Sequence, residues 1–308
     1  RKYKKASPVP QNKSKQPEDA AVQISQTKRI FVTGGAGGIG KAIVQAFCRT
    51  GCRVAFCDMN ETTGQQTAQE TGAAFYPVDI SDKDALEHCM QSLFNEWGDI
   101  DVIINNAGIS EFSPLTETDV EAFDRIMSVN LRPVFITSHA LAVHRKKQTN
   151  ANPYGRIINL CSTRYLMSEP DSEGYAASKG GIYSLTHALA MSLAKQHITV
   201  NSISPGWIQN HDYGQLRLED HAQHPSGRVG KPEDIARICV FLCQEENDFI
   251  NGENSRYSYK LENFSDVWID THSNEAQFTN IPPGDYYLKV KYNDGCLLYT
   301  SDAADDLT

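Results

Sequence analysis

The stretch KRIFVTGGAGGIGKAIVQAFCR, residues 28–49, places a β-branched run, a glycine-rich turn and an amphipathic segment in immediate succession. The run at residues 28–33 predicts a buried strand, while Ile39, Ile43 and Phe47 have the spacing of one helix face. Glycines between the two let the chain turn sharply and bring backbone N–H groups against a pyrophosphate at the positive end of the helix. A glycine-rich turn also occurs without a ligand, so this stretch alone predicts only a strand–turn–helix unit.

Strands and helices go on alternating along the chain to about residue 254. Short hydrophobic runs predict further strands at residues 53–57, 74–78, 101–104, 156–160 and 198–203. Longer segments predict helices at residues 81–97 (capped by Ser81), 117–130, 134–147, 175–196 and 232–243. Hydrophobic strands that alternate with helices form a parallel sheet covered on both faces. We therefore predict an α/β fold, a Rossmann-type doubly wound parallel sheet, that binds its ligand beyond the C-terminal strand ends.

The composition is that of a folded, acidic protein. The 308 residues carry a net charge of −9 with 22% charged residues, and this length is ample for a sizeable core. The acidic balance argues against nucleic-acid binding, and there is no run of about 18 apolar residues for a membrane span. Eight scattered cysteines without zinc spacing predict reduced thiols and a cytoplasmic location. We expect a small-molecule substrate, no nucleic acid, no membrane and no metal, since His221 and His224 lack an evident third ligand.

Residues 1–29 differ from the rest in charge and texture. They hold eight basic residues against two acidic ones, which leaves −15 on the other 279 residues. Three prolines, many polar residues and no apolar period predict that residues 1–27 form a disordered basic linker without the apolar core of a secretory signal. A basic arm for anionic partners is the alternative.

Asp58 ends the second predicted strand, 18 residues beyond Gly40. A carboxylate at this place can accept hydrogen bonds from an adenosine ribose diol and would repel a 2′-phosphate. The pattern therefore favours NAD over NADP as the cofactor. The alternative is that Asp58 only caps the helix that follows.

The run Tyr175-Ala-Ala-Ser-Lys179 follows Ser162 by 13 residues. Tyr175 and Lys179 share one helix face at positions i and i+4. A free phenol has a pKa of about 10, and a neighbouring ammonium stabilises the phenolate, so the pair could exchange a proton near neutral pH. Ser162, at the end of the fifth strand, can point its hydroxyl at the same substrate oxygen. A Tyr–Lys pair alone would be structural; the serine at this offset favours catalysis.

Two more motifs occupy strand ends: NNAG at residues 105–108 after the fourth strand, and Pro205-Gly206 after the sixth. In this order and on these elements, the glycine-rich turn, NNAG, the serine, the YxxxK pair and PG resemble the classical short-chain dehydrogenase/reductase family over about residues 28–254.

The resemblance implies a role for each matching residue. Tyr175 would be the catalytic acid–base, Lys179 would tune it and hold the nicotinamide ribose, and Ser162 would orient the reacting group. Asn130 would support a water relay to the lysine. The residues implied to bind the cofactor are Gly34, Gly38, Ile39, Gly40, Asp58, Asp79, Ile80, Asn106, Ala107, Gly108, Tyr175, Lys179, Pro205, Gly206 and Ile208. One departure is Asn210, which stands where the family usually has the threonine that contacts the carboxamide.

The resemblance implies an NAD(P)-dependent oxidoreductase that transfers a hydride between nicotinamide and an alcohol or ketone. One alternative is an NADPH-dependent 3-oxoacyl reductase, against which Asp58 argues. The other is a non-catalytic nucleotide-binding sensor module fused to a β-sandwich. We expect the substrate to be selected by residues 207–228, with Trp207, Tyr165 and Met167 lining its pocket.

The chain changes character after residue 254, where the family would continue into a last sheet strand. Alternating aromatic residues and IPPGDYYLKV predict antiparallel strands in residues 255–295, and this part resembles the three-Y β-sandwich domain of two-component regulators. Residues 296–308 resemble a translated sequencing adapter. We therefore expect an NAD-binding domain at 28–254, a partial β-sandwich fragment at 255–295 and an artefactual tail, as in an assembly chimera; a genuine two-domain fusion is the alternative.

The expected join has a physical consequence. Without a seventh strand, the sixth would keep an unpaired edge unless SRYSYKL (residues 255–261) filled the slot. We therefore expect marginal stability, and doubt the homo-oligomer that the family resemblance implies.

Overall fold

The computed structural model describes residues 28–148, 152–224 and 226–252, and the backbone of three later strands at 255–262, 269–271 and 287–294. The predicted linker at residues 1–27 and the predicted tail at residues 296–308 lie outside the described residues.

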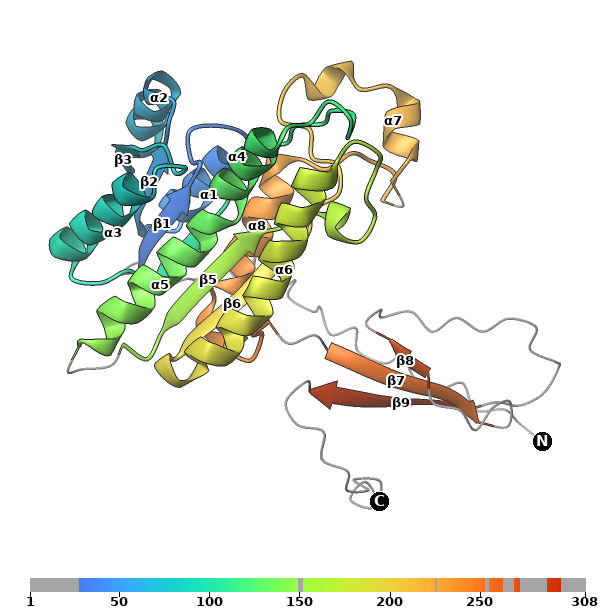
Figure 1. Cartoon of the computed structure of the whole chain (residues 1–308). Coiled ribbons are helices and arrows are strands. Elements are labelled where there is room, and N and C mark those ends of the chain that lie inside the picture. The colour runs from blue at the N-terminus through green and yellow to red at the C-terminus, as the bar shows by residue number, and fades with distance from the viewer. Residues whose placement is uncertain are drawn as a thin grey trace, which may run out of the picture.

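The first part of the chain forms a six-stranded parallel sheet in the order β3-β2-β1-β4-β5-β6 (Figure 1). Its strands are β1 (Arg29–Thr33), β2 (Arg53–Asp58), β3 (Ala74–Pro77), β4 (Val102–Asn105), β5 (Gly155–Leu160) and β6 (Ile198–Ile203). Strands β2 and β3 are added on one side of β1, and β4 to β6 on the other. The strand order therefore reverses between β1 and β4, which is where doubly wound sheets open a crevice for ligands. The predicted Rossmann-type fold is confirmed.

The helices are α1 (Gly38–Arg49), α2 (Glu61–Thr71), α3 (Lys83–Trp97), α4 (Val120–Asn130), α5 (Arg132–Lys146), α6 (Glu173–Leu193), α7 (Leu218–Ala222) and α8 (Pro232–Leu242). Short 3-10 turns lie at η1 (Thr163–Tyr165), η2 (Ala194–Gln196), η3 (Tyr213–Gln215) and η4 (Glu245–Asn247).

Two apolar layers cover the sheet because successive strand side chains point to opposite faces. Ile30 and Val32 of β1 pack with α1 and α8, whereas Phe31 packs on the other face with α3, α5 and α6. Within the described residues α4 and α5 together, Val120–Lys146, are long and apolar enough to cross a membrane, and 44% of the 18-residue apolar window in this stretch is buried inside the fold. In α5 the buried Ile136 and Leu141 pack with Phe31 on this face of the sheet.

One helix was not predicted, and four helix starts differ from the prediction, among them that of α5, which begins at Arg132 and not at residue 134. Helix α2 was not predicted, because its polar sequence has no apolar period and only Gly64 and Thr67 are buried. Asp82, not Ser81, caps α3 by accepting from two backbone N–H groups. Helix α4 begins at residue 120 after its cap, Asp119, and α6 begins two residues before Tyr175. Side-chain capping decides the starts of α3 and α4, where several Ser or Asp residues close together leave the choice open in the sequence. Helices α5 and α6 begin without a side-chain cap.

The edge strand β6 has partners that the sequence did not predict. The backbone N–H of Val200 donates to Asn251 Oδ1 at 2.8 Å, and Asn201 bonds the carbonyl of Ile250 and the N–H of Gly252 at 2.7 and 2.8 Å. The segment SRYSYKL does not fill the slot beside β6. It lies in β7 (Ser255–Glu262), which pairs antiparallel with β8 (Ile269–Thr271) and β9 (Tyr287–Asp294) in a separate sheet, as the predicted antiparallel strands require.

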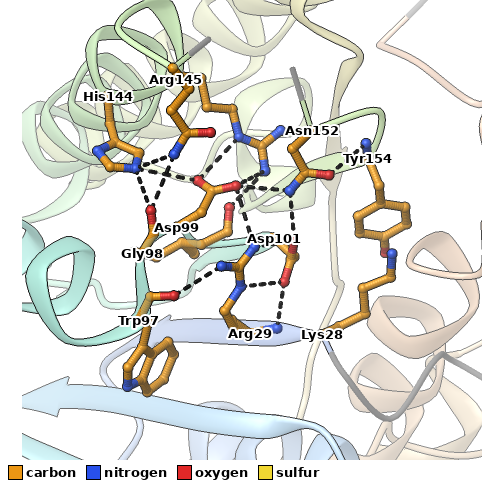
Figure 2. Close-up of polar contacts among 12 residues, drawn as sticks. Lys28, Arg29, Trp97, Gly98, Asp99, Asp101, His144, Arg145, Asn152 and Tyr154 are labelled. Carbon is orange, nitrogen blue, oxygen red and sulfur yellow. Dashed lines mark hydrogen bonds and ion pairs between the residues drawn. The ribbon is translucent and has the colours of Figure 1, made fainter. Parts of the chain in front are cut away.

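A cluster of charged side chains joins the N-terminal ends of the strands (Figure 2). Asp101, just before β4, accepts hydrogen bonds from the backbone N and Nε of Arg29 at 2.8 Å and from its Nη2 at 2.9 Å. Asn152 donates to Asp99 at 2.8 Å and to Asp101 at 2.9 Å. Buried Arg145 of α5 pairs with Asp99 at 3.3 Å. This network ties the starts of β1, β4 and β5 together, at the edge opposite the glycine-rich turn.

Candidate active site

A cleft of about 810 Å³ opens at the C-terminal ends of the strands. It is the place that the sheet topology assigns to a ligand. All but one of the predicted catalytic and cofactor-binding residues line it: Gly34, Gly38, Ile39, Gly40, Asp58, Asp79, Ile80, Asn106, Ala107, Gly108, Ser162, Tyr175, Lys179, Pro205, Gly206 and Ile208. The exception is Asn130, which is buried and does not line the cleft.

The glycine-rich turn fits a pyrophosphate. Gly34 and Gly38 have φ values of +67° and +51°, which favour glycine. A Cβ on Gly40 would collide with the carbonyl of Gly34, so the turn can pack this tightly only with glycine. Helix α1 begins there with no side-chain cap and no acidic residue in its first turn. Its N-terminal backbone donors and positive dipole end therefore remain suited to an anionic group.

Asp58 lies at the rim of the same cleft with both carboxylate oxygens held in place. Oδ2 accepts from the N–H of Ala36 and Oδ1 from the N–H of Asn60, each at 3.0 Å. The alternative that Asp58 caps the next helix is wrong, since Asn60 caps α2 by accepting from Thr63 at 3.1 Å. Each carboxylate oxygen can accept more than one hydrogen bond, so Asp58 remains able to bind a ribose diol.

Asn106 has a bracing role that the sequence did not indicate. Its Nδ2 donates to the carbonyls of Thr33 and Gly34, both at 3.0 Å. The hydroxyl of Thr33 in turn accepts from the N–H groups of Asn106 and Ala107. These bonds fix the end of β4 against the glycine-rich turn. Farther along the rim, Asp79 is exposed and accepts from the N–H of Ser81 at 2.9 Å.

Ser162, Tyr175 and Lys179 meet at the other end of the cleft. Ser162 follows β5 directly, whereas Tyr175 and Lys179 lie one turn apart on α6. The Nζ of Lys179 lies 5.6 Å from the centre of the Tyr175 ring and donates to the carbonyl of Leu160 at 2.8 Å. Burial lowers the pKa of Lys179 to about 8, since an ammonium loses hydration in the interior.

The pKa of Tyr175 corrects one expectation. We expected the ammonium to lower it, but burial raises the pKa of this phenol above its ordinary value of 10. A hydrogen bond with Ser162 and the charge of Arg164 act in the opposite direction and are the weaker effects. Lys179 makes its hydrogen bond to the Leu160 carbonyl. The i, i+4 spacing brings the two groups together on one face but does not set where the ammonium points.

Asn130 is buried at the end of α4 and bonds the backbone of the loop after β4. Its Oδ1 accepts from the N–H of Ile109 at 2.8 Å, and its Nδ2 donates to the Ile109 carbonyl at 2.9 Å and to Ser178 Oγ at 3.0 Å. Asn130 thereby holds the NNAG loop close to α6. The water relay that we expected at this residue stays a prediction.

The substrate end of the cleft differs from the prediction. Trp207 lines it, but Tyr165 stacks on Tyr183 at 4.3 Å between ring centres, and Met167 is 63% exposed outside the lining. Lining residues that the sequence did not indicate include Ile109, Phe112 and Arg164, whereas His211 belongs to the predicted segment 207–228. Arg164 could have been found from its place two residues after Ser162.

Asn210, the departure from the family pattern, also lines the cleft. Its side-chain amide lies 3.1 Å from where a Cβ on Gly38 would be. The amide is therefore beside the glycine-rich turn. Among the described residues no group of three His, Cys, Asp or Glu side chains is placed to hold a metal.

The comparisons with known proteins agree with this geometry. The family model described as "Enoyl-(Acyl carrier protein) reductase" matches residues 34–257, and the Y_Y_Y domain model matches residues 248–296. An uncharacterised oxidoreductase from Thermotoga maritima is 40% identical over 241 residues, 74% of this chain and 93% of the relative. A sorbitol dehydrogenase from Cereibacter sphaeroides is 31% identical over 72% of this chain and 93% of its own.

A solved structure adds a cofactor to the comparison. The 3-ketoacyl-(acyl-carrier-protein) reductase from Brucella melitensis, complexed with NADH, superimposes with a TM-score of 0.67 at 29% identity. The match covers 73% of this chain and 94% of that protein.

Proposed function

We propose that this chain, which belongs to the short-chain dehydrogenase/reductase family and is an oxidoreductase of that family, transfers a hydride between NAD and an alcohol or ketone. The observation that carries the proposal is that one cleft holds a predicted cofactor-binding end and a predicted catalytic end. Asp58 is held at one end beside the glycine-rich turn, and Ser162, Tyr175 and Lys179 meet at the other.

NAD, when bound, accepts or supplies the hydride at its nicotinamide. The residues of the chain transfer the proton and orient the substrate. In alcohol oxidation the hydroxyl proton passes to Tyr175 as the carbon–hydrogen bond breaks, and in ketone reduction Tyr175 returns a proton to the oxygen. Ser162 bonds the same oxygen and orients it. The hydrogen bond with Ser162 and the charge of Arg164 act to lower the pKa of Tyr175 and so favour its phenolate form, against the larger effect of burial.

The choice of NAD rests on Asp58. A carboxylate held at the ribose end favours a free diol and repels a 2′-phosphate, and no basic residue stands at positions 36 and 37. The NADH in the Brucella melitensis relative accords with this choice. A cytoplasmic location, where such a cofactor is supplied, and the division of the chain at residue 254 stay predictions.

Tyr175→Phe tests the proposal. We expect turnover on a panel of alcohols and ketones to fall about 10²- to 10⁴-fold, the usual contribution of acid–base catalysis, while NADH still binds by fluorescence titration. Tyr183→Phe removes a phenol from the same helix outside the cleft lining and is the matched control. Unchanged turnover in Tyr175→Phe would contradict the assigned mechanism.

Two other functions have an observation in their favour. The Brucella melitensis relative favours a 3-oxoacyl reductase, and a strong kinetic preference for NADPH and acyl thioesters would select it. The Y_Y_Y match favours a nucleotide sensor fused to a β-sandwich. That function predicts NAD binding without turnover and one continuous transcript through residues 254 and 255.

A further inference from the structure

The two ends of the cleft differ in charge. The acidic residues among its lining are Asp58 and Asp79, both on the rim where the adenosine part of the cofactor is expected. The lining near Ser162 and Tyr175 carries Arg164 and Lys179 instead. A cleft with low-dielectric walls concentrates the field of such charges. The reacting end of this cleft is therefore suited to an anionic molecule.

Arg164 is placed by the same turn that places Ser162. It lies in η1, and its backbone N–H donates to Ser162 Oγ at 3.2 Å. Its Nη1 donates to the carbonyl of Met167 at 3.2 Å, which orients the guanidinium. Its charge reaches the phenol, since it acts to lower the pKa of Tyr175. The Arg164 side chain is 33% exposed, so it is mostly packed but remains partly accessible.

Glu169 is the present partner of the Arg164 guanidinium. The carboxylate of Glu169 is 55% exposed, and ion pairs this exposed contribute little to stability. Met167 and Glu169, the two contacts of the guanidinium, lie outside the cleft lining. A substrate carboxylate would therefore bind by drawing the guanidinium from Glu169 toward the cleft, where the new ion pair is better shielded from water. The planar guanidinium is able to hold a carboxylate through two parallel hydrogen bonds, which an ammonium cannot do.

We propose that Arg164 selects a substrate that carries a carboxylate, so that the reacting alcohol or ketone is a hydroxy acid or an oxo acid. This inference rests on the proposed function. Phe112, whose ring centre lies 5.9 Å from that of Tyr175, and Trp207 provide apolar walls for a short carbon chain beside the charge. Arg164 is a specificity residue in this proposal, and Tyr175 keeps the proton transfer.

The test compares short-chain 2- and 3-hydroxy acids with their methyl esters, which keep the reacting carbon and lose the charge. We expect the wild-type protein to prefer the acids in kcat/KM. In Arg164→Ala the acid-to-ester ratio should fall about 10- to 100-fold, mostly through KM for the acid, since a hydrogen bond to a charged group is worth about that factor. Arg164→Lys should fall between, and Glu169→Gln should raise the ratio. Arg125→Ala is the matched control, because Arg125 pairs with Glu111 outside the cleft lining.

A binding measurement keeps the inference separate from catalysis. Isobutyrate and isobutyramide, which cannot react, are titrated by calorimetry into NADH-saturated Tyr175→Phe protein with and without Arg164→Ala. Tighter binding of isobutyrate that depends on Arg164 supports the proposal. Equal binding of both probes, or an acid-to-ester ratio unchanged by Arg164→Ala, overturns it. If the wild-type protein turns over neither the acids nor the esters, but isobutyrate binding still depends on Arg164, the proposed function is overturned and the carboxylate site is supported.

Discussion

Replacement of Asp101 by Asn tests the charged cluster at the N-terminal edge of the sheet. Asp101 is buried and accepts four hydrogen bonds, three from Arg29 and one from Asn152. The amide keeps the shape, removes the charge and presents an N–H group to donors. Loss of one partner of a buried ion pair costs about 3 to 5 kcal/mol. Because Asp99 stays within 3.4 Å of Arg29, we expect the lower figure, about 3 kcal/mol of unfolding free energy.

The effect should depend on pH in one direction. Burial is the largest single effect and raises the pKa of Asp101, but the hydrogen bonds from Arg29 and Asn152 and the charge of Arg29 together hold the pKa below its ordinary value of 3.8. A carboxylate with a lowered pKa stabilises the fold fully above its unfolded pKa of about 3.9 and loses that contribution as pH falls through the folded pKa. The difference between wild type and Asp101→Asn should therefore be constant from neutral pH to about pH 5 and shrink below about pH 4.

Urea unfolding followed by circular dichroism measures both quantities. Asp124→Asn, an exposed carboxylate on α4, is the control and should change stability by less than about 0.5 kcal/mol. Arg29→Met and the double variant complete a mutant cycle, in which a coupling of about 0.5 to 3 kcal/mol is expected for residues in one network. A loss below about 1 kcal/mol, or a difference that persists unchanged at low pH, would refute the reasoning.

Three further predictions concern the cleft. Gly40→Ala should abolish NADH binding measured by fluorescence, because the added Cβ meets the carbonyl of Gly34; NADH binding at wild-type affinity would show that the turn can relax. Lys179 should titrate near pH 8 in the ligand-free protein by NMR of the labelled side chain, since burial lowers its pKa. The folded pKa of Lys179 lies below its unfolded value of about 10.4, so the free energy of unfolding should rise with pH between about pH 8 and pH 10. Lys179→Met should remove this rise. A titration midpoint at the ordinary pKa would contradict the burial argument. Asp58→Ala should lower kcat/KM for NAD about tenfold and raise it for NADP, by loss of the diol acceptor and of the repulsion; an unchanged NAD-to-NADP ratio would remove the basis for the cofactor choice.

The local features of this protein follow from its sequence alone. Short continuous hydrophobic runs indicate the six strands, most of which are buried on both faces, and period-3.6 patterns indicate most helices. The glycine-rich turn is also local, since only glycine tolerates the φ of Gly34 and the contact at Gly40. Asp58, Ser162 and Tyr175 could be placed at strand or helix ends for the same reason. Parallel strands end at a common edge, so the prediction that these residues meet there followed from the parallel arrangement of the strands.

Only the tertiary structure decided the contacts between distant segments. Arg29 and Asp101 are 72 residues apart and join because β1 and β4 are neighbours. The ammonium of Lys179 bonds the Leu160 carbonyl of a different element, and its burial, which sequence spacing does not contain, sets its pKa. The place of Arg164 in the cleft and the pairing of β7 away from β6 depend likewise on which surfaces meet. Desolvation and long-range pairing arise from packing in three dimensions, so one-dimensional patterns do not determine them.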